Sequence, residues 1–247
     1  MSAVALRIRY ELVGKVRFVS SRDLSRIWER TLRRVGVPVA YSHGFTPRPR
    51  LSFGLALPTC AASSAEYVDV RLSESLDPWG GPAGIGTAID DALPDGLAVH
   101  AAACVDAAGP SLQESVTAVT WEITDFEQSS EQLVADAAST LAADELLLER
   151  ERKGSATVDD IRPAIIDLSV HDPVDDPLQD VDRSTRVIAD VASVGRSLRP
   201  AELARAVFGV DDAANLRIHR VAQWADGADG RSELLPPPDR VRSLSAC

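Results

Sequence analysis

The sequence of 247 residues lacks the short motifs that mark several large enzyme classes. Its three cysteines form no CxxC pair, which argues against a zinc site or an iron–sulfur cluster in this chain. There is no GxxxxGKS/T phosphate loop, no GxGxxG turn after a predicted strand and no GxSxG nucleophile elbow. The sequence therefore carries no recognisable catalytic motif, and we expect no bound cofactor.

Long apolar runs are also absent. No run approaches the roughly 18 to 20 residues that a helix needs to span a bilayer. The N-terminal stretch MSAVALRIRYELVG alternates apolar and charged residues, which is typical of a strand rather than a signal peptide. We therefore expect a cytoplasmic protein with no membrane partner. Hydrophobic residues make up 45% and charged residues 26% of the chain, an ordinary globular composition. The length suits one large domain or two of about 100 residues each.

Basic residues are scarce overall but concentrated near the N-terminus. The net charge of the chain is −11. Residues 1–54 nevertheless contain 11 Lys or Arg against 3 Asp or Glu, a local charge of +8, and the remainder carries −19. The acidic remainder would repel nucleic acid, whereas the basic N-terminal region could bind an anion.

The basic region begins with a strand pattern and a helix pattern. Residues 4–12 alternate with period 2, as in a strand with one buried face. Ser20, with Asp23 three residues later, resembles a capping box, so we expect a helix from about residue 21 that stops at Gly36. The residues expected to face inward at helical spacing are Leu24, Ile27, Trp28, Thr31, Leu32 and Val35.

Further patterns in the first half indicate the fold class. Residues 51–57, 66–72 and 97–105 alternate as strands, and the small residues 60–65 suit a hairpin connection. A weak helix is expected around residues 85–93, after a Gly-rich loop at 80–86. The resulting order, βαββαβ, is the ferredoxin-like plan of an antiparallel sheet with two helices on one face.

The second half repeats this order after a polar linker at residues 106–115. Strands are expected at 116–124, 145–152, 161–170, 186–194 and 215–224, with helices at 129–143 and 199–209. We therefore predict an α+β protein of two tandem ferredoxin-like units with antiparallel sheets. Residues 1–105 form the first unit, residues 116–224 form the second with an extra strand, and residues 225–247 form a disordered tail.

The stretch VRFVSSRDLSRIWERTLRRVGVPVAYSHGFTPRPRLSFGLALP, followed by SAEYVDVRL, resembles the radical SAM-linked family. DDIRP at residues 159–163 and SLRPAEL at 197–203 resemble its second-half signatures, so the resemblance covers most of the chain. These bacterial proteins have no assigned function, and they occur either as the C-terminal part of a cobalamin-binding radical SAM protein or as a separate chain linked to one. The resemblance implies a radical SAM protein as partner, with any radical chemistry on that other chain.

The residues that match family positions are Phe18, Ser20, Asp23, Arg33, Arg34, Pro38, Tyr41, Ser42, Gly44, Phe45, Pro47, Pro49, Ser52, Glu66, Tyr67, Arg162 and Pro163. The chain departs from the family at Ser21 and Arg48, where histidine is common, and at Thr59 and Cys60, where glycine is usual. The missing histidines favour binding over catalysis.

Two groups of residues are candidates for binding RNA or another anion. The first is the outer face of the helix, where arginines at steps of three and four share one side and suit phosphate groups: Arg22, Arg26, Arg30, Arg33 and Arg34, with Arg17 extending the charge. The second is the loop SHGFTPRPR, whose prolines stiffen an arginine-bearing backbone and whose rings could stack on bases: Tyr41, Ser42, His43, Phe45, Arg48 and Arg50. Alternatively, the helix arginines could pair with acidic residues, and Phe45 could pack into the core.

Three functions remain open from the sequence. The first is a non-catalytic accessory or substrate-presenting partner of a radical SAM enzyme, binding RNA through the basic N-terminal domain. The second is a ferredoxin-like RNA-processing enzyme that uses His43 with Tyr41 or Ser42. The third is an interaction scaffold whose arginines bind an acidic protein surface. The spacing of the remaining histidines assembles no metal site.

Overall fold

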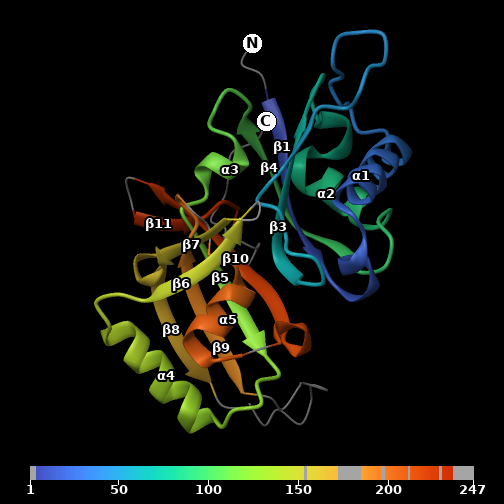
Figure 1. Ribbon diagram of the computed structural model, residues 1–247. Coiled ribbons are helices and arrows are strands. Elements are labelled where there is room, and N and C mark those ends of the chain that lie inside the picture. The colour runs from blue at the N-terminus through green and yellow to red at the C-terminus, as the bar shows by residue number, and fades with distance from the viewer. Residues whose placement is uncertain are drawn as a thin grey trace. The chain divides into compact units, whose positions relative to one another are not determined.

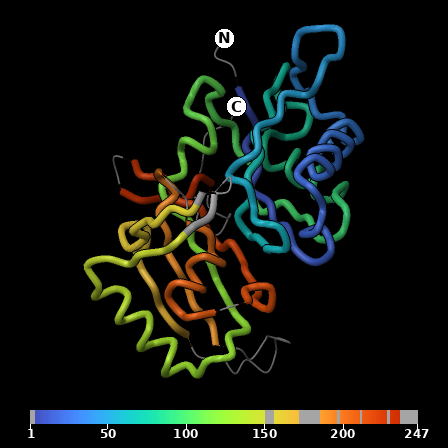
Figure 2. The backbone as a smooth tube through the Cα atoms, in the orientation of Figure 1, coloured from blue at the N-terminus to red at the C-terminus, as the bar shows by residue number. Residues whose placement is uncertain are grey.

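Mostly antiparallel strands and a few helices make up the two units into which the chain divides (Figures 1 and 2). The structure, a computed structural model, describes residues 4–152, 155–171, 185–195, 198–210, 212–227 and 230–235. One unit comprises the chain up to Val116 together with the residues from Trp224 onward, and the other comprises Thr117–Gln223. The expected mixed α/β class with antiparallel strands is confirmed. Among the described helices, none is long and apolar enough to cross a membrane.

The first unit contains β1 (Val4–Leu12), α1 (Ser21–Val35), β2 (Leu51–Phe53), β3 (Ala62–Arg71), α2 (Gly81–Asp90) and β4 (Leu97–Asp106). The short 3-10 helices η1 (Gly14–Phe18) and η2 (Asp77–Trp79) precede α1 and α2, and the short helix α3 (Leu112–Ser115) follows β4. The strands lie in the order β4-β1-β3-β2, with every neighbouring pair antiparallel.

Helix α1 has the boundaries that its sequence predicts. The Ser20 side chain accepts a hydrogen bond from the Asp23 amide at 3.2 Å, which satisfies one of the unpaired N–H groups of the first turn. The helix stops at Gly36, whose φ of 80° is left-handed backbone that glycine adopts without a Cβ clash. The predicted inward face is confirmed, because Trp28 and Leu32 are buried in the core.

Alternation along β1 and β3 builds the main core of the first unit. Alternate apolar side chains of both strands face α1 and α2, which lie on one side of the sheet (Figure 1). The rings of Tyr10 and Trp28 meet edge to face with their centroids 4.9 Å apart. The largest buried members of this core include Leu6, Ile8, Tyr10, Trp28, Leu32, Val68, Val70, Ile85 and Ile89.

The opposite face of the same strands is covered in part by the C-terminal segment. Strand β11 (Gly230–Glu233) pairs with the end of β10 (Arg217–Gly227), and Leu235 after it is buried beside Tyr67. The Tyr67 hydroxyl donates to the Leu235 carbonyl at 3.4 Å, and burial raises the pKa of Tyr67 to about 12. Arg9 donates to the Glu233 carboxylate at 3.0 Å, with the two side chains only 6% and 7% exposed.

This C-terminal segment differs from the disordered tail expected over residues 225–247. Residues 225–227 continue β10 and Gly230–Glu233 form β11, whereas residues 236–247 lie outside the described residues. The segment shows no strand periodicity in its sequence, because it contacts the rest of the first unit through one buried leucine and one buried carboxylate rather than through alternate apolar side chains.

The second unit contains β5 (Ala118–Thr124), α4 (Ser130–Ala142), β6 (Leu147–Arg152), β7 (Ser155–Asp160), η3 (Arg162–Ala164), β8 (Ile165–His171), β9 (Arg186–Ala192), α5 (Pro200–Phe208), η4 (Ala213–Asn215) and β10. Its strands lie in the order β10-β5-β9-β8, while β6 and β7 pair with each other as a hairpin. The Ser129 side chain caps α4, and Pro200 occupies the first turn of α5.

Several local expectations differ from the structure. Strand β2 ends at Phe53 rather than at residue 57, and β3 begins at Ala62, inside the stretch expected to be a hairpin connection. Pairing with β1 extends to Leu12 opposite Ser63, so contacts with the neighbouring strand override the weak strand propensity of these small residues. The Gly-rich stretch starts α2 because a proline there fixes the backbone of the first helical turn. Elements β7 and α3 have no counterpart in the sequence prediction.

The buried Arg9–Glu233 ion pair predicts a large cost for removing one partner. Glu233→Ala removes a carboxylate that accepts from the buried Arg9 guanidinium, so we expect the free energy of unfolding to fall by about 3 kcal/mol or more. Urea unfolding followed by circular dichroism measures this change. The exposed Glu74 provides the matched control, and an equal effect of Glu74→Ala and Glu233→Ala would contradict the prediction.

Candidate nucleic-acid interface

Five exposed arginines follow one side of α1, opposite the face that packs in the core. Steps of three and four residues place side chains on the same side of a helix, as the sequence predicts. We call this group the arginine surface: Arg22, Arg26, Arg30, Arg33 and Arg34. Arg33 and Arg34 lie in the last turn, where positive charge also interacts favourably with the helix dipole.

The arginine surface has little internal neutralisation. Arg26 pairs with Asp23 of the same helix at 3.2 Å, and this is the one ion pair that the described residues provide to the surface. Arg30 donates its Nε hydrogen to the Arg26 carbonyl at 3.1 Å. The pKa of Asp23 lies below its ordinary value, chiefly because the Ser20 hydroxyl donates to its carboxylate and then because of Arg26 and Arg22. The alternative expected from the sequence is that these arginines pair with acidic residues elsewhere in the chain. Within the described parts of the chain, no such pairing is observed.

Residues 42–50 form a loop that projects from the first unit (Figures 1 and 2). Its two sides pair like a narrow antiparallel ladder: the Ser42 amide donates to the Arg48 carbonyl at 2.9 Å, and the Arg48 amide donates to the Ser42 hydroxyl at 3.0 Å. Tyr41 and Pro49 form an isolated bridge at the base. Gly44, at a φ of 132°, lets the backbone reverse direction at the tip. The loop is therefore closed by its own hydrogen bonds at its base.

The side chains of this loop lie in solvent rather than in the core. The Phe45 ring is fully exposed, so the alternative that it packs inside the first unit is wrong. Tyr41 is 48% exposed, and His43, Arg48 and Arg50 are exposed as well. The loop thus presents aromatic rings and guanidinium groups together at the surface.

Arg17 differs from the other candidate arginines. It lies in η1, is half-buried, and its guanidinium carbon is 4.8 Å from the centroid of the Phe18 ring, a cation–π contact. Its Nε atom is buried with no hydrogen-bond partner among the described residues. The Phe18 ring itself is more than half exposed. Arg17 is therefore less available to a ligand than the arginine surface.

The three groups proposed for catalysis do not form a nucleophile and base pair in this structure. The Ser42 hydroxyl accepts from the Arg48 amide, and no hydrogen bond among the described residues joins His43 to Tyr41 or Ser42. Activation of a hydroxyl needs a base within hydrogen-bond reach of it. The described residues also contain no cluster of metal-ligating side chains.

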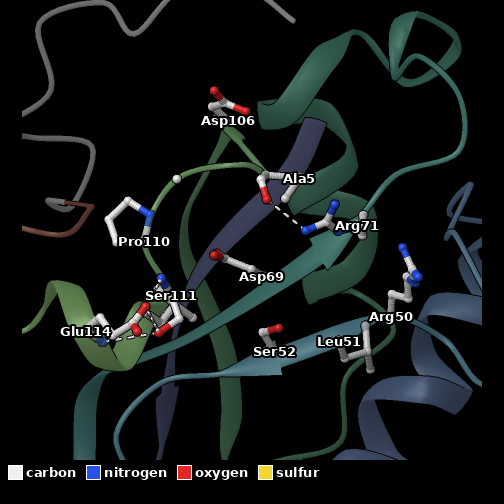
Figure 3. A pocket seen from close by; sticks show the side chains of 13 residues that line it. Ala5, Arg50, Leu51, Ser52, Asp69, Arg71, Asp106, Pro110, Ser111 and Glu114 are labelled. Atoms are coloured by element: carbon white, nitrogen blue, oxygen red, sulfur yellow. Dashed lines mark hydrogen bonds between the residues drawn. The ribbon is translucent and has the colours of Figure 1, made fainter. Parts of the chain in front are cut away.

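A cavity of about 590 Å³ in the first unit was not anticipated from the sequence (Figure 3). Arg50 from the loop lines it, and Ser52, Asp69 and Arg71 from the neighbouring strands add polar groups. The wall opposite comes from the segment between β4 and α3, including Ser111. The alternation in EYVDVRL is the sequence signal that could have indicated these polar groups, because it places Asp69 and Arg71 on the face of the sheet opposite the helix-facing core.

Taken together, the fold and these surfaces define a two-unit α/β protein with a concentrated cationic surface on its first unit. A model of a family described as an uncharacterized protein conserved in bacteria, DUF2344, matches residues 5–200, and the chain belongs to this family. No curated protein matches the chain.

The Ser20 and Asp23 contacts predict a pH-dependent change at the start of the arginine surface. Because the pKa of Asp23 is lowered in the folded state, its contribution to stability is present above its ordinary pKa and is lost as the pH falls through the lowered value. Ser20→Ala removes the main cause, so we expect the pKa of Asp23 to rise toward its ordinary range, and the lost cap to cost about 1 kcal/mol of stability. Carboxyl chemical shifts from NMR titration and thermal unfolding measure the two effects. Ser25→Ala on the same helix is the control, and a Ser20→Ala variant with an unchanged Asp23 titration would contradict the assignment.

Proposed function

We propose that this protein is a non-catalytic accessory protein that binds RNA through its first unit and presents it to a radical SAM enzyme. The observation that carries RNA binding is the concentration of exposed arginines with few ion-pair partners on a chain of net charge −11. The radical SAM part depends on the sequence resemblance and on the absence of a cluster-binding motif in this chain. A cytoplasmic location agrees with both parts.

The arrangement of charge and rings supports RNA over a small isolated anion. Several guanidinium groups spaced along a 15-residue helix match a chain of phosphates, and each phosphate contact releases condensed counterions. The loop adds Tyr41 and Phe45, whose exposed rings could stack on unpaired bases. Single-stranded RNA offers both groups at once, because its bases are free of pairing.

We further infer that each unit has the ferredoxin-like plan. In both units the first and third strands of the plan are central and the second and fourth are at the edges: β4-β1-β3-β2 and β10-β5-β9-β8. Two helices connect the strands in each, and the β6–β7 hairpin is an insertion in the second. This plan supports tandem ferredoxin-like units, in which one sheet face of each unit is free of the connecting helices.

RNA affinity should depend steeply on salt concentration if the proposal is right. We expect the dissociation constant of a fluorescent single-stranded RNA of about a dozen nucleotides, measured by anisotropy, to rise strongly with KCl. Arg30→Ala and Arg48→Ala should each reduce the slope of log affinity against log salt by about 0.7, the loss of one phosphate contact. Arg217→Ala is the control, because Arg217 is exposed but paired with Asp125 at 3.0 Å in the second unit. A flat salt response, or equal slopes in all variants, would overturn RNA binding.

The interaction scaffold is distinguished by charge reversal. If the surface instead binds an acidic protein, the combined variant Arg26→Glu, Arg30→Glu and Arg34→Glu should abolish partner binding while leaving RNA affinity unchanged.

Association with a radical SAM enzyme is tested by co-purification. We expect the tagged protein, expressed in its native host, to retain a chain that carries an iron–sulfur cluster and cobalamin, identified by mass spectrometry and by visible absorption. Retention of RNA alone would leave the RNA part standing and remove the radical SAM part.

A further inference from the structure

The cavity beside the loop lies on the face of the first-unit sheet that α1 and α2 do not cover (Figure 3). The apolar side chains Val68 and Val70 of β3 face the helices, so Asp69 and Arg71 face the other way. Across the ladder, Ser52 of β2 is the partner of Asp69, which puts Ser52 on the same face. The floor of the cavity is therefore a polar patch at the edge of the sheet.

Two arginines lie on neighbouring strands at this edge. The Arg71 amide donates to the Arg50 carbonyl at 3.0 Å, one step beyond the pair Leu51 and Val70, so Arg50 and Arg71 are cross-strand neighbours. Like charges directly opposite one another destabilise a sheet unless an anion neutralises them. Arg71 is held by a hydrogen bond from Nη2 to the Ala107 carbonyl at 2.7 Å. No acceptor for the Arg50 guanidinium occurs among the described residues.

Among the described residues, no carboxylate of the cavity forms an ion pair with either arginine. Asp69 accepts two hydrogen bonds from Arg7, at 2.9 Å each. Asp106 accepts from the Ala108 amide at 2.9 Å, and Glu114 accepts from both the amide and the hydroxyl of Ser111, at 2.9 and 2.8 Å. These bonds from Ser111 hold the pKa of Glu114 below its ordinary value, so it stays ionised within its capping box. Arg50 and Arg71 therefore have no ion-pair partner among the described residues, and an anionic ligand would supply one.

The cavity is polarised. Figure 3 shows Arg50 and Arg71 on one side, with Asp106, Pro110 and Glu114 on the other. A ligand that fits carries negative charge at one end and hydrogen-bond donors such as ribose hydroxyls or a base amine at the other. The volume of about 590 Å³ lies within the range of small-molecule sites and has room for one nucleotide.

We propose that this cavity binds the phosphomonoester of a nucleotide, with Arg50 and Arg71 contacting the phosphate and the Ser52 hydroxyl within the same patch. A phosphomonoester carries about −1.5 to −2 charges at pH 7, which matches two guanidinium groups, whereas an internal phosphodiester carries one. The phosphate belongs either to the terminal nucleotide of a bound RNA or to a free mononucleotide. The first of these two sources rests on the proposed RNA-binding function, which the cavity proposal deepens.

Continuity with the loop favours the terminal nucleotide as the natural source. Arg50 follows Arg48 and Pro49 directly, so an RNA strand bound along the loop arginines would extend to the edge of the cavity. The cavity would then hold the end of the RNA while the arginine surface holds its body.

Mononucleotide binding tests the cavity independently of RNA. In isothermal titration calorimetry, we expect adenosine 5′-monophosphate or adenosine 3′-monophosphate to bind the full-length protein and adenosine to bind at least tenfold more weakly. Arg50→Gln and Arg71→Gln should each weaken binding about tenfold or more, the effect of losing a hydrogen bond to a charged group. Arg217→Gln is the control and should leave mononucleotide affinity unchanged, because Arg217 does not line the cavity and pairs with Asp125 in the second unit. Arg71→Lys, which keeps the charge but not the forked geometry, guards against misfolding of the Arg71→Gln protein.

A second measurement compares RNA ends. The same single-stranded RNA is titrated with a 5′-phosphate, with a 3′-phosphate and with neither. Tighter binding of one phosphorylated end, lost in Arg50→Gln but kept in Arg217→Gln, supports the terminal nucleotide; mononucleotide binding without any end preference supports the free nucleotide. Salt-dependent RNA binding with no end preference and no mononucleotide binding overturns the cavity proposal while leaving RNA binding intact. Mononucleotide binding with no RNA binding overturns the proposed function and keeps the cavity.

Discussion

Alternation along the two central strands of the first unit, β1 and β3, is the constraint on which the other features depend. Alternate side chains of β1, from Leu6 to Leu12, and Val68 and Val70 of β3 are apolar and lie under α1 and α2, and this burial fixes the register of the sheet. The charged side chains between them are then committed to the opposite face. On that face, Arg9 forms an ion pair with Glu233, Arg7 forms one with Asp69, and Arg71 lines the cavity. A register slip of one residue would bury these arginines against the helices, so core and site are specified together.

The same burial orients the arginine surface. Helix α1 contributes a narrow apolar face centred on Trp28 and Leu32, and the steps between its arginines leave them on the side away from the sheet. The 26 basic and 37 acidic residues of the chain could neutralise one another locally, yet the one ion pair described on this surface comes from Asp23 within the helix itself. Charge segregation of this kind raises the local potential that an anionic polymer meets.

Sequence reasoning reached the elements that carry strong local signals. Ser20 and Gly36 bound α1 because a side-chain cap and a left-handed residue act within a few positions of the chain. It missed the features that depend on distant partners. The start of β3 is set by pairing with β1. The position of Leu235 is set by packing against Tyr67, a contact that only the folded sheet creates. The exposed position of Phe45 was equally hidden, since an aromatic residue in a loop packs inward about as readily as it remains in solvent.

Arg50 shows why the candidate site could be predicted only in part. Its charge and its place in the TPRPR segment predict an anion contact, but its cross-strand neighbour, Arg71, lies across the ladder with β3, and sequence spacing does not reveal that pairing. The loop is closed at its base by bonds between Ser42 and Arg48, and the backbone of Arg50 bonds to both Ala40 and Arg71. Arg50 therefore leaves a preorganised loop at a fixed position on the sheet edge, which lowers the entropic cost of binding a phosphate there. Arg50 thus both ends the exposed cationic loop and lines the cavity, so the proposed RNA-binding loop and the proposed phosphate site share this residue.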